Sequence, residues 1–156
     1  MKTILKAFVV CLAIAGQVTV AIAQPNEIAA IKAVVAKETS SFMNVDFKNW
    51  SDTWLKAPYS YWSYSDSTST SYVEGWDALE KNFAEYFKTS KPSNASITNE
   101  WQEVRVYGNG AYVRFIQKVK DNIDHDETSQ MRVLEKTKDG KWKVICVGAI
   151  AKYPKD

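Results

Sequence analysis

The sequence is poor in the residues that most often carry enzyme chemistry. Its 156 residues include one histidine and two cysteines, which are too few for a disulfide-based scaffold. It contains no phosphate-binding loop, no pairing of a nucleophile with a base, and no residue spacing typical of a metal site. We therefore expect neither a metal ion nor a cofactor.

The sequence also lacks an excess of charge of either sign. The whole chain has 20 basic and 18 acidic residues. Residues 1–23 contain two of the lysines and no acidic residue, so the rest of the chain has 18 residues of each sign. No basic stripe remains that could contact a series of phosphates. We therefore do not expect a nucleic-acid partner.

The first 23 residues form a distinct apolar segment. Lys2 and Lys6 precede an apolar stretch that begins at Ala7, and the segment ends in Ala21-Ile22-Ala23. This arrangement is typical of a secretory signal peptide. Its uninterrupted apolar run is shorter than the roughly 20 residues that a membrane-spanning helix needs. We expect residues 1–23 to be cleaved. The mature domain, residues 24–156, would then act in a periplasm or outside the cell, without a membrane span.

Aromatic and aliphatic side chains are abundant. Hydrophobic residues make up 46% of the chain, and tryptophan, tyrosine and phenylalanine together number 20. This is enough for the core of one domain. Apolar residues recur at helical spacing in the first half and alternate along strands in the second half, which predicts an α+β fold with a bent sheet over helices. The predicted helices occupy about residues 27–43, 47–57 and 76–90, and the predicted strands residues 59–64, 72–74, 97–107, 111–119, 128–136 and 142–150.

Three stretches carry a resemblance to a known superfamily. They are Val73-Glu74-Gly75-Trp76-Asp77, Gln130-Met131-Arg132-Val133-Leu134 and Asp139-Gly140-Lys141-Trp142-Lys143-Val144. Their order and spacing resemble the nuclear transport factor 2-like superfamily, in particular SnoaL-like proteins and the association domain of calcium/calmodulin-dependent kinase II. The resemblance implies a cone-shaped, cystatin-like fold, with a bent antiparallel sheet wrapped around three N-terminal helices and a pocket open at one end. This fold serves enzymes, carriers and assembly modules alike, so it does not by itself give the function.

The resemblance implies a pocket lined mostly by apolar side chains, with a few polar groups. The aromatic candidates for this lining are Trp54, Tyr61, Trp62, Trp76, Phe83, Trp101 and Phe115. The alternative for each of them is ordinary core packing, because an aromatic residue at helical spacing packs more often than it binds a ligand.

Arg132 and Gln117 are the polar candidates for the pocket. The resemblance aligns Arg132 with an arginine that faces the cavity and can pair with a carboxylate, and such a pair can be bidentate. Gln117 lies on the more apolar face of the predicted strand 111–119. The alternative for Arg132 is a solvent-exposed position beside Glu135 or Glu103. The expected ligand is a small apolar or aromatic molecule, with or without a carboxylate.

An isomerase, cyclase or dehydratase with this fold would need a general base in the pocket, usually Asp or His. The sequence offers Asp52 on the second predicted helix and His125 in the loop before the strand 128–136. Both positions also suit a solvated surface residue. We therefore expect an exported, non-catalytic small-molecule-binding protein, with such an enzyme as the first alternative.

Assembly is the other alternative. The resemblance implies that outer sheet faces pair with one another. Tyr112, Arg114 and Ile116 on one predicted strand, with Met131 and Val133 on the next, share such a face. We expect a homodimer, which is compatible with either of the other functions.

Overall fold

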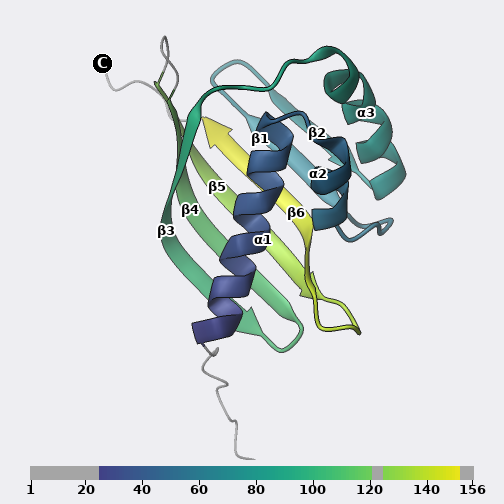
Figure 1. Cartoon of the computed structure of the whole chain (residues 1–156), viewed down its shortest axis with the longest axis vertical. Coiled ribbons are helices and arrows are strands. Elements are labelled where there is room, and N and C mark those ends of the chain that lie inside the picture. Colours follow the sequence, from purple (N-terminus) through teal and green to yellow (C-terminus); the bar gives the residue numbers. More distant parts are fainter. Residues whose placement is uncertain (1–24, 121–124, 152–156) are drawn as a thin grey trace, which may run out of the picture.

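The computed structural model describes residues 25–120 and 125–151, so the predicted signal peptide, residues 1–23, lies outside the described part of the chain. Figure 1 shows the three helices and six strands of this part. In chain order they are α1 (Pro25–Met43), α2 (Phe47–Thr53), β1 (Tyr61–Ser65), β2 (Thr70–Glu74), α3 (Trp76–Thr89), β3 (Ser96–Tyr107), β4 (Gly110–Lys120), β5 (His125–Lys136) and β6 (Trp142–Ala151). Within residues 25–120 and 125–151, no helix is apolar over a length that would cross a bilayer.

The six strands form one curved sheet in the order β2-β1-β6-β5-β4-β3. Four of its five strand pairs are antiparallel, and one pair, β1 with β6, is parallel. The predicted α+β class is confirmed, but the sheet is mixed and not antiparallel throughout. The parallel pair arises because the early β1–β2 hairpin is added to the edge of the last strand. Parallel pairing needs a long connection, which α3 and the strands β2 to β5 supply here.

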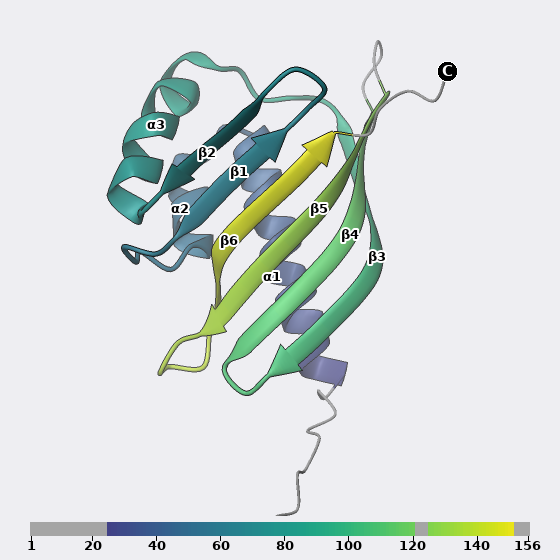
Figure 2. The same ribbon diagram turned by 180° about the vertical axis from the view of Figure 1, so that it is seen from behind.

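Strands β3 to β6 curve around α1, which lies across the concave face of the sheet (Figure 1). The register shifts between Trp101 and Glu103 in β3 and between Val133 and Leu134 in β5. Such bulges bend a strand and increase its twist, which helps the sheet curve around the helix. Figure 2 shows the opposite, outer face of the sheet, with α1 and α2 behind it and α3 beside its β2 edge.

The helices bury one side each against the sheet. Ile31 and Val35 of α1 are fully buried, and Phe42 packs against the same core near the end of the helix. Helix α2 ends at Thr53, earlier than predicted, because the chain after it joins the sheet. Trp54 forms a β-bridge with Val144, and the next backbone N–H donates to the Val144 carbonyl at 2.9 Å.

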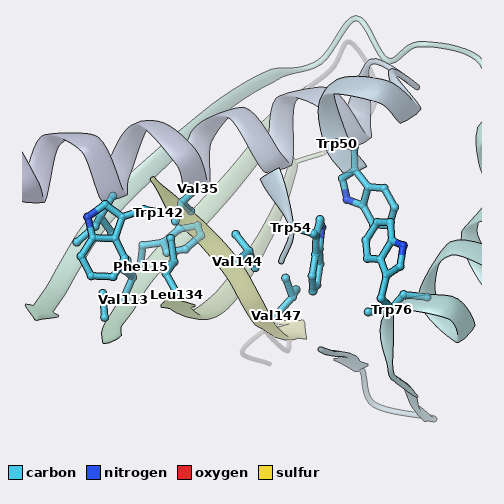
Figure 3. Packing of buried hydrophobic residues seen from close by; sticks show 13 residues of the cluster. Val35, Trp50, Trp54, Trp76, Val113, Phe115, Leu134, Trp142, Val144 and Val147 are labelled. Carbon is cyan, nitrogen blue, oxygen red and sulfur yellow. The ribbon is translucent and has the colours of Figure 1, made fainter. Parts of the chain in front are cut away.

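The core under α1 has two aromatic ends, which Figure 3 shows. At one end Trp50, Trp54 and Trp76 pack together, and the ring centroid of Trp50 lies 5.7 Å from each of the other two. At the other end Phe115 and Trp142 lie under the first turns of α1 (Figure 3). The space that this core leaves open lies beneath the last turns of α1.

Candidate functional site

An open cavity of about 790 Å³ lies between the C-terminal half of α1 and the concave face of the sheet. Its volume is in the range of pockets that hold small organic molecules, roughly 300–1,000 Å³. Much of its wall is apolar, from Phe42, Met43, Trp62, Val119, Val147 and Ala149. Successive residues of a strand point to opposite faces, so the lining residues of β1, β4 and β6 recur at every second position. Alanines at positions 149 and 151 of β6 leave room that larger side chains would fill.

A buried ion pair forms the polar part of the wall. Nε and Nη2 of Arg132 on β5 donate to the same carboxylate oxygen, Oε2 of Glu38 on α1, at 3.2 and 3.1 Å. Both residues are only 4% exposed. The Thr39 hydroxyl also donates to this oxygen, at 3.4 Å. All three hydrogen bonds fall on Oε2, and Oε1 of Glu38 accepts none from the residues that the structure describes.

Two of the three remaining donors of the guanidinium are also engaged. Nη1 of Arg132 donates to the side-chain oxygen of Gln130 at 2.8 Å and to the backbone carbonyl of Met131 at 3.0 Å. The Arg132 guanidinium also lies over the ring of Phe115, at 5.5 Å from its centroid. These contacts hold the side chain in one position on the floor of the cavity.

A second polar group stands beside the ion pair. Nε2 of Gln117 on β4 donates to the hydroxyl of Thr39 at 3.3 Å and to the side-chain oxygen of Asn99 at 3.2 Å. Gln117 is buried, and its side-chain oxygen accepts no hydrogen bond from the described part of the chain. The cavity therefore presents two acceptors that the described residues leave unused, Oε1 of Glu38 and Oε1 of Gln117.

No family model matches the sequence, and neither does any curated protein. Solved structures do match. A ketosteroid isomerase-like protein from Erwinia carotovora atroseptica is similar over 84% of this chain and 100% of its own, with 17% identity and a TM-score of 0.62. A protein of unknown function from Shewanella oneidensis, described as nuclear transport factor 2-like, covers 81% of this chain and 99% of its own, with 15% identity and a TM-score of 0.61.

A third similar structure, from Nostoc punctiforme, has a cystatin-like fold and unknown function. It covers 84% of this chain and 95% of its own, with 14% identity and a TM-score of 0.60. The chain has the nuclear transport factor 2-like fold. The resemblance seen in the sequence is therefore confirmed, as a likeness of fold.

The nuclear transport factor 2-like fold places three of the predicted site residues at the cavity. Arg132, Gln117 and Trp62 all line it. For Arg132 this replaces the solvent-exposed alternative with a buried position, and the acid beside it is Glu38 on α1 instead of Glu135 or Glu103.

Most of the other predicted aromatic residues belong to the packed core. Trp54 and Trp76 are buried there, and the indole N–H of Trp54 has no acceptor among the described residues. Trp101 packs against Phe115, with ring centroids 5.1 Å apart. Phe83 lies behind the cavity wall and meets Trp62 edge-on, with centroids also 5.1 Å apart. For these residues the structure gives the core-packing alternative.

Tyr61 lies on the other face of the sheet. Its ring stacks on that of Tyr72 in β2, with centroids 6.3 Å apart, and Tyr72 is exposed. Its neighbour Trp62 lines the cavity, as strand alternation requires. Tyr61 is therefore a residue of the outer face and not of the cavity wall.

Asp52, one of the two predicted bases, lies outside the cavity. The side chain of Asp52 on α2 is 51% exposed and pairs with Lys48 at 3.0 Å. The hydrogen bond from Lys48 and its charge lower the pKa of Asp52. His125 begins β5 opposite Lys120, and its side chain lies outside what the structure describes. Among residues 25–120 and 125–151, no three His, Cys, Asp or Glu side chains are grouped so that they could hold a metal ion.

Glu38 is the site residue that the sequence analysis missed. It follows Ile31 by seven residues and Val35 by three, so it falls on the buried stripe of α1, one turn before Phe42. An acidic residue on an apolar helical stripe needs a partner inside the fold. This position in the stripe was a signal for a buried ion pair with Arg132.

Proposed function

We propose that the protein is an exported, non-catalytic binding protein for a small apolar or aromatic molecule, which occupies the cavity between α1 and the sheet. The observation that carries the proposal is the combination of an apolar wall with a buried ion pair whose outer oxygen is unused. The apolar wall would remove a ligand's surface from water, and the polar groups would orient it.

The energetics of the ion pair support a role in binding. Removing two charges from water costs several kcal/mol for each ion, and replacing a buried pair with apolar residues is often neutral or stabilising. The Glu38–Arg132 pair is therefore a poor device for stability alone. The open space beside it, with unused acceptors on Glu38 and Gln117, favours a function that needs polar groups in an apolar site.

A ligand carboxylate on Arg132 was the finer expectation from the sequence. In the structure the Glu38 carboxylate occupies that position on the guanidinium. A ligand carboxylate would have to displace it, or bind beside it against its charge. The expectation of an apolar or aromatic ligand does not depend on whether a ligand carboxylate can reach Arg132.

Export is proposed from the sequence pattern of residues 1–23. The full chain expressed with its own N-terminus should be recovered outside the cytoplasm, with a mature N-terminus at Gln24 by intact mass spectrometry. A full-length mass in the cytoplasmic fraction would contradict export and would leave the binding proposal unaffected.

Filling the cavity tests the binding proposal. Ala149 lines the cavity from β6, and Ala149→Leu would occupy part of the space. Small aromatic fragments that bind the wild-type protein should lose about tenfold or more in affinity, about 1.4 kcal/mol, because the added side chain occupies space that the fragment needs. Ala36→Leu adds the same side chain at an exposed position of α1 and should leave binding unchanged. If both variants bind fragments like the wild type, the cavity is not the binding site.

Glu38 favours a second candidate, the isomerase, cyclase or dehydratase alternative. A general base must present a free carboxylate oxygen to a substrate, and Oε1 of Glu38 meets this geometric condition. A small ketone such as 4-phenyl-2-butanone should then exchange the hydrogens beside its carbonyl in D₂O faster with wild-type protein than with the Glu38→Gln variant. Equal rates for the two proteins, followed by ¹H NMR, would remove this candidate.

The outer face of the sheet favours assembly as a further property. Tyr112, Val133 and Cys146 lie side by side across β4, β5 and β6 in the strand register, and all three are partly exposed. A partner with the same face could cover this row. We propose a homodimer formed through the outer face, which leaves the cavity on the opposite face free for a ligand.

A further inference from the structure

The charges and hydrogen-bond groups of the cavity favour one class of ligand. We infer that the cavity selects an organic amine, cationic at neutral pH, on a compact apolar or aromatic body. This inference rests on the proposed binding function and adds the chemistry of the ligand to it. It departs from the expected carboxylate, for reasons that lie in the contacts of Arg132 and Glu38.

The guanidinium of Arg132 has little left to offer an anion. A bidentate grip on a carboxylate needs two parallel N–H donors. The Nε–Nη2 edge already holds Glu38, at 3.2 and 3.1 Å. Nη1 is held by an amide oxygen and a backbone carbonyl, at 2.8 and 3.0 Å. No free pair of donors remains on this side chain among the described contacts.

The unused groups are acceptors instead. Oε1 of Glu38 and Oε1 of Gln117 receive no hydrogen bond from the described residues, and both residues line the cavity. A ligand that fills the cavity displaces water from these oxygens, and an acceptor then left without a donor is costly, more so when it carries charge. A ligand that brings N–H donors satisfies both oxygens, whereas a carboxylate brings further acceptors.

The charge around the cavity points the same way. Among the residues that the structure describes, three acidic ones line it, Glu38, Asp126 and Glu127, against one basic residue, Arg132. Lys118 stands opposite Glu127 in the β4–β5 register, so we leave Glu127 out of the count of acidic and basic residues. Two carboxylates still face one guanidinium, and the potential in a cleft lined by such an excess attracts cations.

The aromatic part of the wall suits an ammonium group and its body. Phe42, Trp62 and Tyr64 line the cavity next to the polar floor. The face of an aromatic ring attracts a cation, by about 0.5–2 kcal/mol depending on how far water is excluded. The same rings bury the apolar remainder of the molecule. An amine with a single ring therefore matches both parts of the wall.

Three probes with one ring and different head groups test the inference. They are 2-phenylethylamine, 2-phenylethanol and 3-phenylpropanoate, titrated into the full mature protein at pH 7 by calorimetry. We expect the amine to bind about tenfold tighter than either of the others, from its cation–π and ionic contacts. Tightest binding of the carboxylate, equal binding of the alcohol and amine, or binding of none of the three would overturn the inference.

Substitutions at two acidic residues of the cavity, with one control outside it, distinguish the effect of a lost charge on binding from a loss of the folded structure. Glu38→Gln should abolish the preference for the amine. Because this change could unfold the protein, Asp126→Asn at the exposed rim serves as the second variant, and it should lower the preference about two- to threefold through the loss of one nearby charge. Asp52→Asn removes an acid outside the cavity and should change nothing.

The proposed binding function can stand or fail independently of the preference for an amine. If fragments still bind in a way that Ala149→Leu blocks and Ala36→Leu does not, binding in the cavity stands even where the amine shows no advantage. If that comparison finds no cavity ligand of any charge, the proposed function itself fails.

Discussion

At the scale of single residues, the ion pair between Glu38 and Arg132 is the main polar feature of the cavity wall. Each side chain comes from a different element, and each is enclosed except where it meets the cavity. Removing one partner leaves the other charged and buried, which is worse than removing both. Stability measurements on single and double variants can therefore show whether the pair forms as described.

Arg132→Met should lower the free energy of unfolding by about 3–5 kcal/mol, because Glu38 loses its partner inside the fold. The double variant Glu38→Leu/Arg132→Met should recover much of this loss, and urea denaturation measures both. Lys48→Met breaks the exposed pair with Asp52 and should leave the unfolding curve unchanged. An Arg132→Met variant as stable as Lys48→Met would contradict the buried pair.

A surface carboxyl in the turn before β6 offers a pH test. The hydrogen bond from Lys141 and that from the Thr137 hydroxyl lower the pKa of Asp139 from 3.8 to about 2. A carboxyl whose pKa is lower in the folded state stabilises that state above its unfolded pKa. This contribution is lost as the pH falls from about 4 to about 2.

The pKa of Asp139 should be measured by following its carboxyl carbon by NMR. In the Lys141→Met variant we expect the pKa to rise toward 3.8, since the first cause of the shift is removed. A pKa that stays near 2 in this variant would show that Lys141 is not the cause.

At the scale of the elements, the join between β2 and α3 depends on Gly75. Its φ is +83° and its ψ is 142°, a conformation open almost only to glycine. Its backbone N–H donates to the Ser60 carbonyl at 2.7 Å. A Cβ at this position would also stand 3.3 Å from the carbonyl oxygen of Pro58. The glycine therefore fixes how α3 turns back over the sheet.

Gly75→Ala should cost about 1–3 kcal/mol of unfolding free energy, because the backbone must hold a conformation that alanine rarely adopts. Gly108→Asn is the matched control. Gly108 also has a positive φ, of 59°, but nothing lies within 4 Å of an added Cβ, and asparagine tolerates this left-handed conformation. Equal stability of the two variants in thermal denaturation would contradict the role of Gly75.

The helices and strands could be predicted from periodicity, because burial against one sheet face imposes a clear pattern on each. Glu38 was missed although its place on the apolar stripe of α1 marked it as inward-facing, and the core role of Trp54 could not be predicted. Periodicity shows that a residue faces inward, and it does not show whether the space inside is filled. The parallel pairing of β1 with β6 was missed for a related reason, since no local pattern in the hairpin records which edge it joins.

The resemblance indicated Arg132 and strand alternation indicated Gln117, and both line the cavity together with Trp62. Tyr61 was not separated from Trp62, although one of two adjacent strand residues must face outward. Trp76 and Trp101 illustrate a different limit, as bulky rings suit a cavity wall and a packed core equally well.

At the scale of the whole molecule, we propose that the concave face of the sheet binds the ligand and that the outer face forms the dimer. The concave face holds α1 and the cavity, and the outer face carries the row of Tyr112, Val133 and Cys146. Light scattering on the mature protein should give the mass of a dimer, and Val133→Glu should give a monomer with cavity binding intact. A wild-type protein that is monomeric at high concentration would remove the dimer.

The most direct test of the central claim is a map of backbone amide shifts in ¹⁵N-labelled protein, recorded while small aromatic fragments are added. The account predicts saturable shifts centred on Glu38, Gln117 and Ala149, on three elements that all line the cavity. Shifts confined to the outer face, or no saturable shifts with any fragment, would contradict it.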